Sequence, residues 1–209
     1  MDKLTEISTM LQRGRAKKIP ALVQEALDEG YSAVDILNKA LLAGMNIVGE
    51  QFKKEEVFVP EVLVAARAMT KGIETLKPYL QGEESTSIGK AVIGTVKGDQ
   101  HDIGKNLVKI MLEGKGIEVY DLGVEVTAET FIEKAKEYDV DIICCSALLT
   151  TTMAEMGKVV ELVKAEGLDV KVMIGGAPVN QEFCDQIGAD YYTDDAATAS
   201  DVAKSILVG

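Results

Sequence analysis

The chain has 209 residues with 22 basic and 34 acidic side chains, so its formal net charge is −12 at pH 7. This acidic balance disfavours binding to nucleic acid, which depends on basic side chains that neutralise phosphates, and it disfavours an anionic membrane surface. The chain is 47% hydrophobic, has no run of about 18 apolar residues that could span a bilayer and begins without a signal-peptide pattern, so we expect a cytoplasmic globular protein.

The segment 1–81 carries the pattern of amphipathic helices. Apolar residues recur at spacings of three and four, which is the period of a helix with one buried face. Helices are expected near 4–11, 20–30, 32–52 and 60–80, with Ser32 as an N-cap and Pro20 and Pro60 in first turns. Short connections between them predict an antiparallel four-helix bundle. The following segment, 82–88, is small and polar and is predicted to be a linker.

From residue 89 to residue 209, short runs rich in valine and isoleucine alternate with helical stretches. Strands are expected at 90–96, 117–122, 140–146, 170–174 and 190–193, and helices at about 102–114, 127–138, 151–166, 180–187 and 195–207. Parallel strands need crossover helices, so five such units predict an α/β fold: a flavodoxin-like (Rossmann-type) five-stranded parallel sheet preceded by the helical bundle. Ligands on such sheets bind beyond the carboxyl ends of the strands, between the first and third strands.

One loop between a strand and a helix stands out. The segment 98–104 reads Gly-Asp-Gln-His-Asp-Ile-Gly, and His101 is the single histidine of the chain. Asp99 is close enough in sequence to orient the imidazole, and Gly104 lets backbone approach a bulky ligand where the helix opens. Asp102 is a candidate cap for that helix. By itself a lone histidine is most often an ordinary loop residue, so the neighbouring motifs decide its interpretation.

Other cofactor motifs are missing from the sequence. No Gly-x-Gly-x-x-Gly follows a predicted strand, so a dinucleotide site has no fingerprint. Gly104-Lys105-Asn106 lacks the hydroxyl residue of a phosphate-binding P-loop. A second histidine for a zinc triad is missing as well, and Cys144 and Cys145 fit small core residues of the third predicted strand.

Three short motifs follow the first, third and fourth predicted strands. They are Asp99-x-His101-x-x-Gly104, Ser146-x-Leu148 and Gly175-Gly176. Together they resemble the signature of cobalamin-binding domains of the base-off/His-on type, such as the cobalamin-binding module of cobalamin-dependent methionine synthase. In such domains the histidine replaces the dimethylbenzimidazole of the cofactor as the lower cobalt ligand. The resemblance therefore implies that His101 is the metal ligand and that Asp99 holds its second ring nitrogen.

The same resemblance implies a set of residues around the cofactor. The expected cofactor-binding residues of this domain are Gly98, Asp99, Gln100, His101, Asp102, Gly104, Ser146, Leu148, Thr150, Thr152, Gly175 and Gly176. The serine and leucine of the second motif would wall a tunnel for the nucleotide tail, and the glycine pair would leave it room. Thr152 stands where similar domains have a hydroxyl that completes a relay, so His101, Asp99 and Thr152 form the candidate catalytic set. The alternative for Thr150 and Thr152 is capping of the 151–166 helix.

The helical half carries a resemblance of its own. Its segments 45–52 and 57–62 look like the helical cap over the upper corrin face in cobalamin-dependent methyltransferases. Phe52 and Val59 match the apolar contacts on the reactive side of the cobalt, and ordinary bundle core is the alternative. Together the two resemblances cover nearly the whole chain, which looks like a stand-alone corrinoid protein of the methanol, methylamine, betaine and aryl-ether methyltransferase systems.

That family implies a methyl carrier that holds cobalamin or a related corrinoid. It would shuttle a methyl group on cobalt from a substrate methyltransferase to a second methyltransferase, with tetrahydrofolate or coenzyme M as the final acceptor. An ATP-dependent reductive activator is a further implied partner, and the chain would be a subunit of an enzyme system. The alternatives are an adenosylcobalamin mutase small subunit, which generally lacks such a helical cap, a cobalamin-dependent sensor or regulator, and a flavodoxin-like domain without a corrin.

Overall fold

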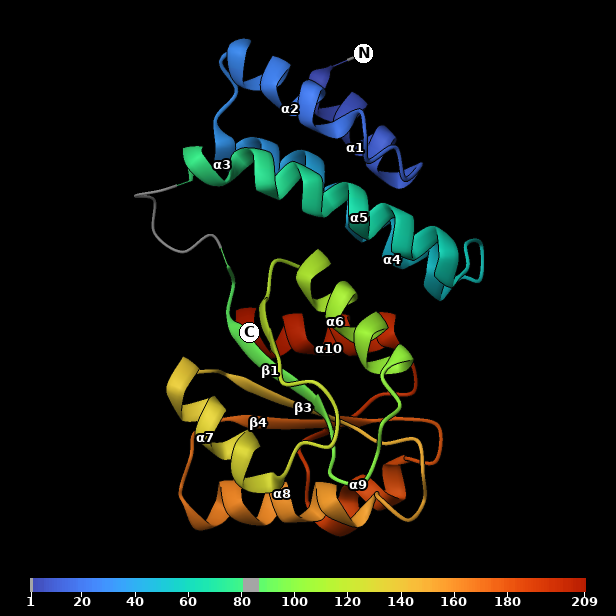
Figure 1. The fold of residues 1–209 in the computed structure, drawn as a ribbon, viewed down its shortest axis with the longest axis vertical. Helices are drawn as coiled ribbons and strands as arrows, with labels where there is room; N and C mark the ends of the chain where they lie inside the picture. Colours follow the sequence, from blue (N-terminus) through green and yellow to red (C-terminus); the bar gives the residue numbers. More distant parts are fainter. Residues whose placement is uncertain (1, 81–86) are drawn as a thin grey trace. The chain divides into compact units, whose positions relative to one another are not determined.

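A computed structural model describes residues 2–80 and 87–209 (Figure 1). The chain divides into two compact units, the first formed by the N-terminal helices and the second by most of the chain from Ser87 on. The predicted linker, 82–88, lies outside the described residues except at its last two positions, and the predicted domain limits stay a prediction. Within the described ranges, no helix is both long and apolar enough to cross a membrane.

The first unit contains only helices, joined by short turns, within its described residues. In chain order it contains α1 (Lys3–Gln12), α2 (Ile19–Asp28), α3 (Ala33–Ile36), the π-helix η1 (Leu37–Leu42), α4 (Ala43–Lys53), α5 (Val59–Leu76) and the 3₁₀-helix η2 (Lys77–Tyr79). Ser32 caps α3 as predicted, because its hydroxyl accepts a hydrogen bond from the backbone N–H of Asp35 at 3.0 Å. Pro20 and Pro60 lie in the first turns of α2 and α5.

The third predicted helix, 32–52, differs from the expectation of one regular helix. It is α3, η1 and α4 in succession, with a π-helical stretch in the middle. A π-helical turn takes an additional residue and is invisible to a search for the 3.6-residue period. The apolar side chains still face inward along the whole segment, since Ile36 before it, Leu37 and Leu41 within it, and Met45 and Val48 after it are all buried.

The second unit is an α/β fold. In chain order the residues from Ser87 on form β1 (Lys90–Thr95), α6 (Ile103–Gly114), β2 (Glu118–Asp121), α7 (Ala128–Tyr138), β3 (Ile142–Ser146), α8 (Ala154–Ala165), β4 (Lys171–Gly175), α9 (Gln181–Ile187), β5 (Tyr191–Tyr192) and α10 (Ala196–Val208). The sheet order is β2-β1-β3-β4-β5 and every pairing is parallel. The predicted flavodoxin-like fold is therefore confirmed.

Both faces of this sheet are covered, which explains why its strands read as continuous apolar runs. Figure 1 shows α6 and α10 on one face and α7, α8 and α9 on the other. Side chains alternate between the faces along β3: Ile143 and Cys145 join the core beside α7 and α8, whereas Ile142 and Cys144 join the core beside α6 and α10. Burial raises the pKa of the Cys144 thiol to about 12, so it stays protonated in the core.

Candidate functional site

The three sequence motifs meet at one edge of the sheet. The His101 loop follows β1, Ser146 ends β3, and Gly175 ends β4. The strand register aligns these ends directly, because Thr95 pairs with Ser146 and Ser146 pairs with Gly175. Parallel neighbours place their carboxyl ends side by side, so residues far apart in sequence form one rim.

Asp99 and His101 are in direct contact on this rim. The Nδ1 atom of His101 lies 2.7 Å from Oδ1 of Asp99, and the backbone N–H of His101 donates to the same oxygen at 3.1 Å. An ionised carboxylate can only accept, so Nδ1 carries a proton, and in the neutral ring this tautomer leaves the lone pair on Nε2. The His101 side chain is 51% exposed, whereas Asp99 is fully buried. The imidazole of His101, which can bind a metal, is thus accessible, whereas the carboxylate of Asp99, which orients it, is in the interior.

The other carboxylate oxygen of Asp99 is equally well satisfied. Oδ2 accepts from the backbone N–H groups of Leu148 at 2.8 Å and Leu149 at 3.2 Å, and from the hydroxyl of Thr152 at 2.9 Å. Burial would raise the pKa of Asp99, but the hydrogen bonds from Leu148, His101 and Thr152 outweigh it and hold that pKa well below its ordinary value. Asp99 is therefore a buried permanent anion that joins the β1 and β3 loops.

Thr152 is held in a turn before α8 and does not cap that helix. Its hydroxyl lies 2.9 Å from both Asp99 Oδ2 and the carbonyl oxygen of Leu149. The residue at the N-cap is Met153, which makes no side-chain capping bond. The capping alternative is therefore wrong for Thr152, and α8 begins three residues later than predicted. Thr150 is exposed and makes no contact with this cluster among the described hydrogen bonds.

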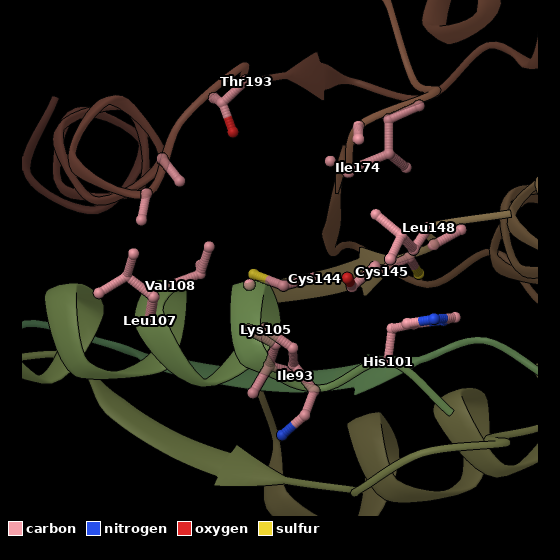
Figure 2. Close-up of a pocket in the computed structure, with 18 of the residues that line it drawn as sticks. Ile93, His101, Lys105, Leu107, Val108, Cys144, Cys145, Leu148, Ile174 and Thr193 are labelled. Carbon is pink, nitrogen blue, oxygen red and sulfur yellow. The ribbon is translucent and has the colours of Figure 1, made fainter. Parts of the chain in front are cut away.

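A cavity of about 560 Å³ opens beside His101 (Figure 2). It lies on the face of the sheet covered by α6 and α10, since Leu107, Val108 and Ala199 line it together with Ile93 and Cys144 of the strands. The predicted site residues that line it are Gln100, His101, Asp102, Gly104, Ser146, Leu148, Gly175 and Gly176. Gly98, Asp99, Thr150 and Thr152 are not among its lining residues.

The surrounding structure requires glycine to a different degree at each glycine position of the site. Gly176 has a φ of +138°, and a Cβ built on it would lie 1.8 Å from the carbonyl oxygen of Ala147. Two backbone segments therefore meet there, and only glycine fits. A Cβ on Gly175 would lie 3.2 Å from the carbonyl oxygen of Thr193, a tighter but less severe approach. At Gly104 a Cβ would meet no described heavy atom within 4 Å, so the fold itself does not require glycine at that position.

Sequence reasoning missed two buried polar residues beside the His101 loop. Thr95, the last residue of β1, is fully buried, and its hydroxyl donates to the carbonyl oxygen of His101 at 2.9 Å. Lys105 is 3% exposed, and its Nζ lies 2.6 Å from Asp121 Oδ1 and 2.7 Å from Asn106 Oδ1. Both follow from tertiary contacts. A threonine ending a strand and a lysine in the first turn of a helix carry no local sign of burial.

Replacing Thr95 with Val should loosen the His101 loop. The change keeps the shape of the side chain but leaves the carbonyl oxygen of His101 without its donor, so we expect the free energy of unfolding to fall by about 1–2 kcal/mol. Urea unfolding followed by circular dichroism measures this difference. Thr95→Ser, which keeps the hydroxyl, is the control. Equal stability of Thr95→Val and the wild type would show that this hydrogen bond is dispensable.

Phe52 and Val59 belong to the first unit. Phe52 lies in the last turn of α4, Val59 is the first residue of α5, and each is partly buried. Between them Phe58 is 65% exposed. Neither Phe52 nor Val59 is therefore a fully buried core residue. Their position over the upper face of a corrin stays a prediction.

Comparison with known proteins gives a consistent result. Two family models match the chain, both described as a B12 binding domain, one over residues 89–201 and the other over residues 4–77. The chain is 45% identical over 207 residues to dimethylamine corrinoid protein 1 of Methanosarcina acetivorans, covering 98% of this chain and 97% of that protein. It is 44% identical over 191 residues to trimethylamine corrinoid protein 1 of the same organism, covering 90% and 88%.

A solved structure is similar over the same extent. The methanol:cobalamin methyltransferase complex MtaBC from Methanosarcina barkeri contains a chain that matches with a TM-score of 0.92 and 31% sequence identity. The match covers 99% of this chain and 80% of that one. The likeness thus includes the helical unit as well as the α/β unit.

Proposed function

The chain belongs to the family of B12 binding domain proteins, and we propose that it is a corrinoid-binding methyl carrier. It serves a substrate methyltransferase and a second methyltransferase in turn. The similarity to dimethylamine and trimethylamine corrinoid proteins along nearly the full chain supports this role, as does the likeness to a methanol:cobalamin methyltransferase complex. The names of the relatives support a methylated amine as the methyl donor, which the partner enzyme would bind.

One observation carries the proposal: His101 presents a free Nε2 at a cavity, with its Nδ1 held by a buried carboxylate. Among the residues that the structure describes, no group of three or more histidine, cysteine, aspartate or glutamate side chains could hold a metal ion. A metal at His101 must therefore bring its other ligands with it, as a cobalt ion in a corrin ring does. The residues present fit such a cofactor.

The chain's own residues then have distinct tasks. His101 would bind cobalt through Nε2, while Asp99 and Thr152 keep its ring in the tautomer that leaves this nitrogen free. The apolar cavity and its glycine rim would take the nucleotide tail. The bound corrinoid supplies the metal that takes up and releases the methyl group, and the protein supplies binding, orientation and delivery. Phe52 and Val59 would cover the reactive face.

Further partners belong to the same proposal. We propose an ATP-dependent reductive activator as a third partner, tetrahydrofolate or coenzyme M as the final methyl acceptor, and the cytoplasm as the location. The helical unit, which has its own match to a B12 binding domain model, disfavours a mutase small subunit. The net charge of −12 disfavours a sensor that acts through nucleic acid.

The single histidine makes a decisive experiment possible. Labelling with ¹⁵N-histidine marks His101 alone, because the chain has no other histidine. We expect the electron paramagnetic resonance spectrum of the reconstituted cobalt(II) protein to show coupling that changes with this label, and His101→Ala to lose it. Unlabelled wild type is the control. Coupling to the benzimidazole nitrogen would contradict ligation by His101, and failure of the wild type to retain cobalamin would overturn the proposed function.

A further inference from the structure

The cavity beside His101 has an apolar interior and one inward-facing threonine hydroxyl that the sequence did not indicate. Its floor and sides come from β1, β3, α6 and α10, including Ile93, Cys144, Leu107 and Val108 (Figure 2). Thr193 follows β5, is only 7% exposed and lines the same cavity. Figure 2 shows its hydroxyl pointing toward the cavity.

The Thr193 hydroxyl has no partner within the described part of the protein. Its backbone N–H donates to the carbonyl oxygen of Ile174 at 3.3 Å, so the main chain is anchored in the sheet. No described side chain or backbone group makes a hydrogen bond with the hydroxyl itself. Because this hydroxyl faces the cavity and has no partner in the described protein, it can donate to or accept from a polar atom of whatever fills the cavity.

Gly175 leaves the approach to this hydroxyl open. A Cβ on Gly175 would lie 3.2 Å from the carbonyl oxygen of Thr193 and 3.9 Å from its hydroxyl oxygen. Any larger side chain at this position would stand beside the hydroxyl and occupy the space in front of it. Ser146, which pairs with Gly175 on β3, lines the same cavity. The glycine therefore separates two hydroxyl residues without blocking either one.

The charges around the cavity favour a neutral ligand atom at Thr193. The next two residues, Asp194 and Asp195, are exposed carboxylates that also line the cavity. Lys105 is the one lysine or arginine that lines this cavity in the described chain, and its ammonium group is bound to Asp121 and Asn106. A phosphate near Thr193 would meet negative charge without a free cation to offset it.

We propose that Thr193 is a specificity-determining residue that hydrogen-bonds the neutral nucleoside part, sugar or base, of the corrinoid tail. This inference rests on the proposed function, because it assumes that a corrinoid occupies the cavity. Through Thr193 the protein would bind corrinoids that carry the nucleotide more tightly than corrinoids that lack it. The apolar walls accept the flat base, and the hydroxyl satisfies one polar atom that would otherwise be buried without a partner.

The test is a pair of binding titrations with the full-length apoprotein. Aquocobalamin carries the nucleotide and diaquocobinamide lacks it, and the dissociation constants of both are measured for the wild type and for two variants. Thr193→Val keeps the branched shape and removes the hydroxyl, whereas Thr193→Ser keeps the hydroxyl. We expect Thr193→Val to weaken binding of aquocobalamin by roughly 2- to 12-fold, the range that one hydrogen bond accounts for. Binding of diaquocobinamide should change less than twofold, and Thr193→Ser should bind both ligands as the wild type does.

The possible contrary results are distinguishable. Equal weakening of both ligands by Thr193→Val would show that the residue supports the fold of the site and does not contact the nucleotide. Unchanged binding of aquocobalamin by this variant would show that water alone satisfies the hydroxyl, and either result overturns the inference while leaving the proposed function intact. A wild-type protein that binds neither ligand would overturn the proposed function itself. Circular dichroism and the thermal midpoint of each variant verify that it is folded.

Discussion

Asp99→Asn is expected to lower both the stability of the protein and its ability to bind cobalt through His101. The new amide has one oxygen and one NH₂ group, while the native carboxylate accepts hydrogen bonds on both oxygens. The NH₂ group must therefore replace one of the two carboxylate oxygens and face the hydrogen-bond donors that this oxygen accepted from. Because this network is buried, we expect the free energy of unfolding to fall by roughly 2–5 kcal/mol.

The orientation of the new amide decides the effect on His101. Three donors, from Leu148, Leu149 and Thr152, converge on the Oδ2 position, so the amide oxygen should turn there. The NH₂ group then faces His101, whose Nδ1 can only accept from it after giving up its proton. The ring proton moves to Nε2 and blocks the lone pair that would bind the metal.

This outcome can be measured without any cofactor. The side-chain ¹⁵N chemical shifts of the single histidine report which ring nitrogen is protonated, and urea unfolding gives the stability. Asp102→Asn is the matched control, since Asp102 is exposed and its carboxylate accepts only from the Asn106 side chain at 3.1 Å in the described network. An unchanged tautomer together with wild-type stability in Asp99→Asn would refute the role assigned to Asp99.

Gly176→Ala is expected to have the largest effect of any glycine substitution in the site. The added Cβ would lie 1.8 Å from the carbonyl oxygen of Ala147, and the residue has a φ of +138°. The backbones after β3 and β4 would have to separate, and the strained φ would remain. We expect a loss of roughly 3–5 kcal/mol in the free energy of unfolding, from backbone strain and overpacking combined.

Two neighbouring glycines serve as controls for this prediction. Gly104→Ala places a Cβ where no described atom outside its own helix and chain neighbours lies within 4 Å, and Gly104 is the second residue of α6. The free energy of unfolding of this variant should therefore rise by roughly 0.4–1 kcal/mol. Gly175→Ala should fall between the two, because its Cβ contact of 3.2 Å is moderate. Thermal and urea unfolding rank the three variants. A Gly176→Ala protein as stable as Gly104→Ala would disprove the backbone contact.

The sheet and the rim of the site could be predicted from the sequence because their signals are local. Each strand is a short apolar run, and in a parallel sheet the segments that follow adjacent strands must lie at one edge. Asp99 and His101 are only two residues apart in the chain, so their contact could also be predicted from the sequence. Fold class and the meeting of the three motifs therefore follow from pattern and topology alone.

The parts that sequence did not predict depend on contacts between distant residues. Thr152 binds Asp99 across 53 positions of the chain, and this bond holds residues 149–152 in a turn and delays the start of α8. Thr95 and Thr193 acquire their roles only when the sheet is assembled. The π-helix η1 preserves the apolar pattern while changing the backbone, so periodicity could not reveal it.

The all-parallel strand order also governs when the cofactor can enter a newly made chain. Ala91 of β1 pairs with Ile142 of β3, and at a synthesis rate of about 5–20 residues per second this partner emerges about 3–10 s later. The cavity needs still more of the chain, because Thr193, Ala196 and Ala199 form part of its wall. The cavity wall is therefore complete only once α10 has been synthesised and has packed against the sheet.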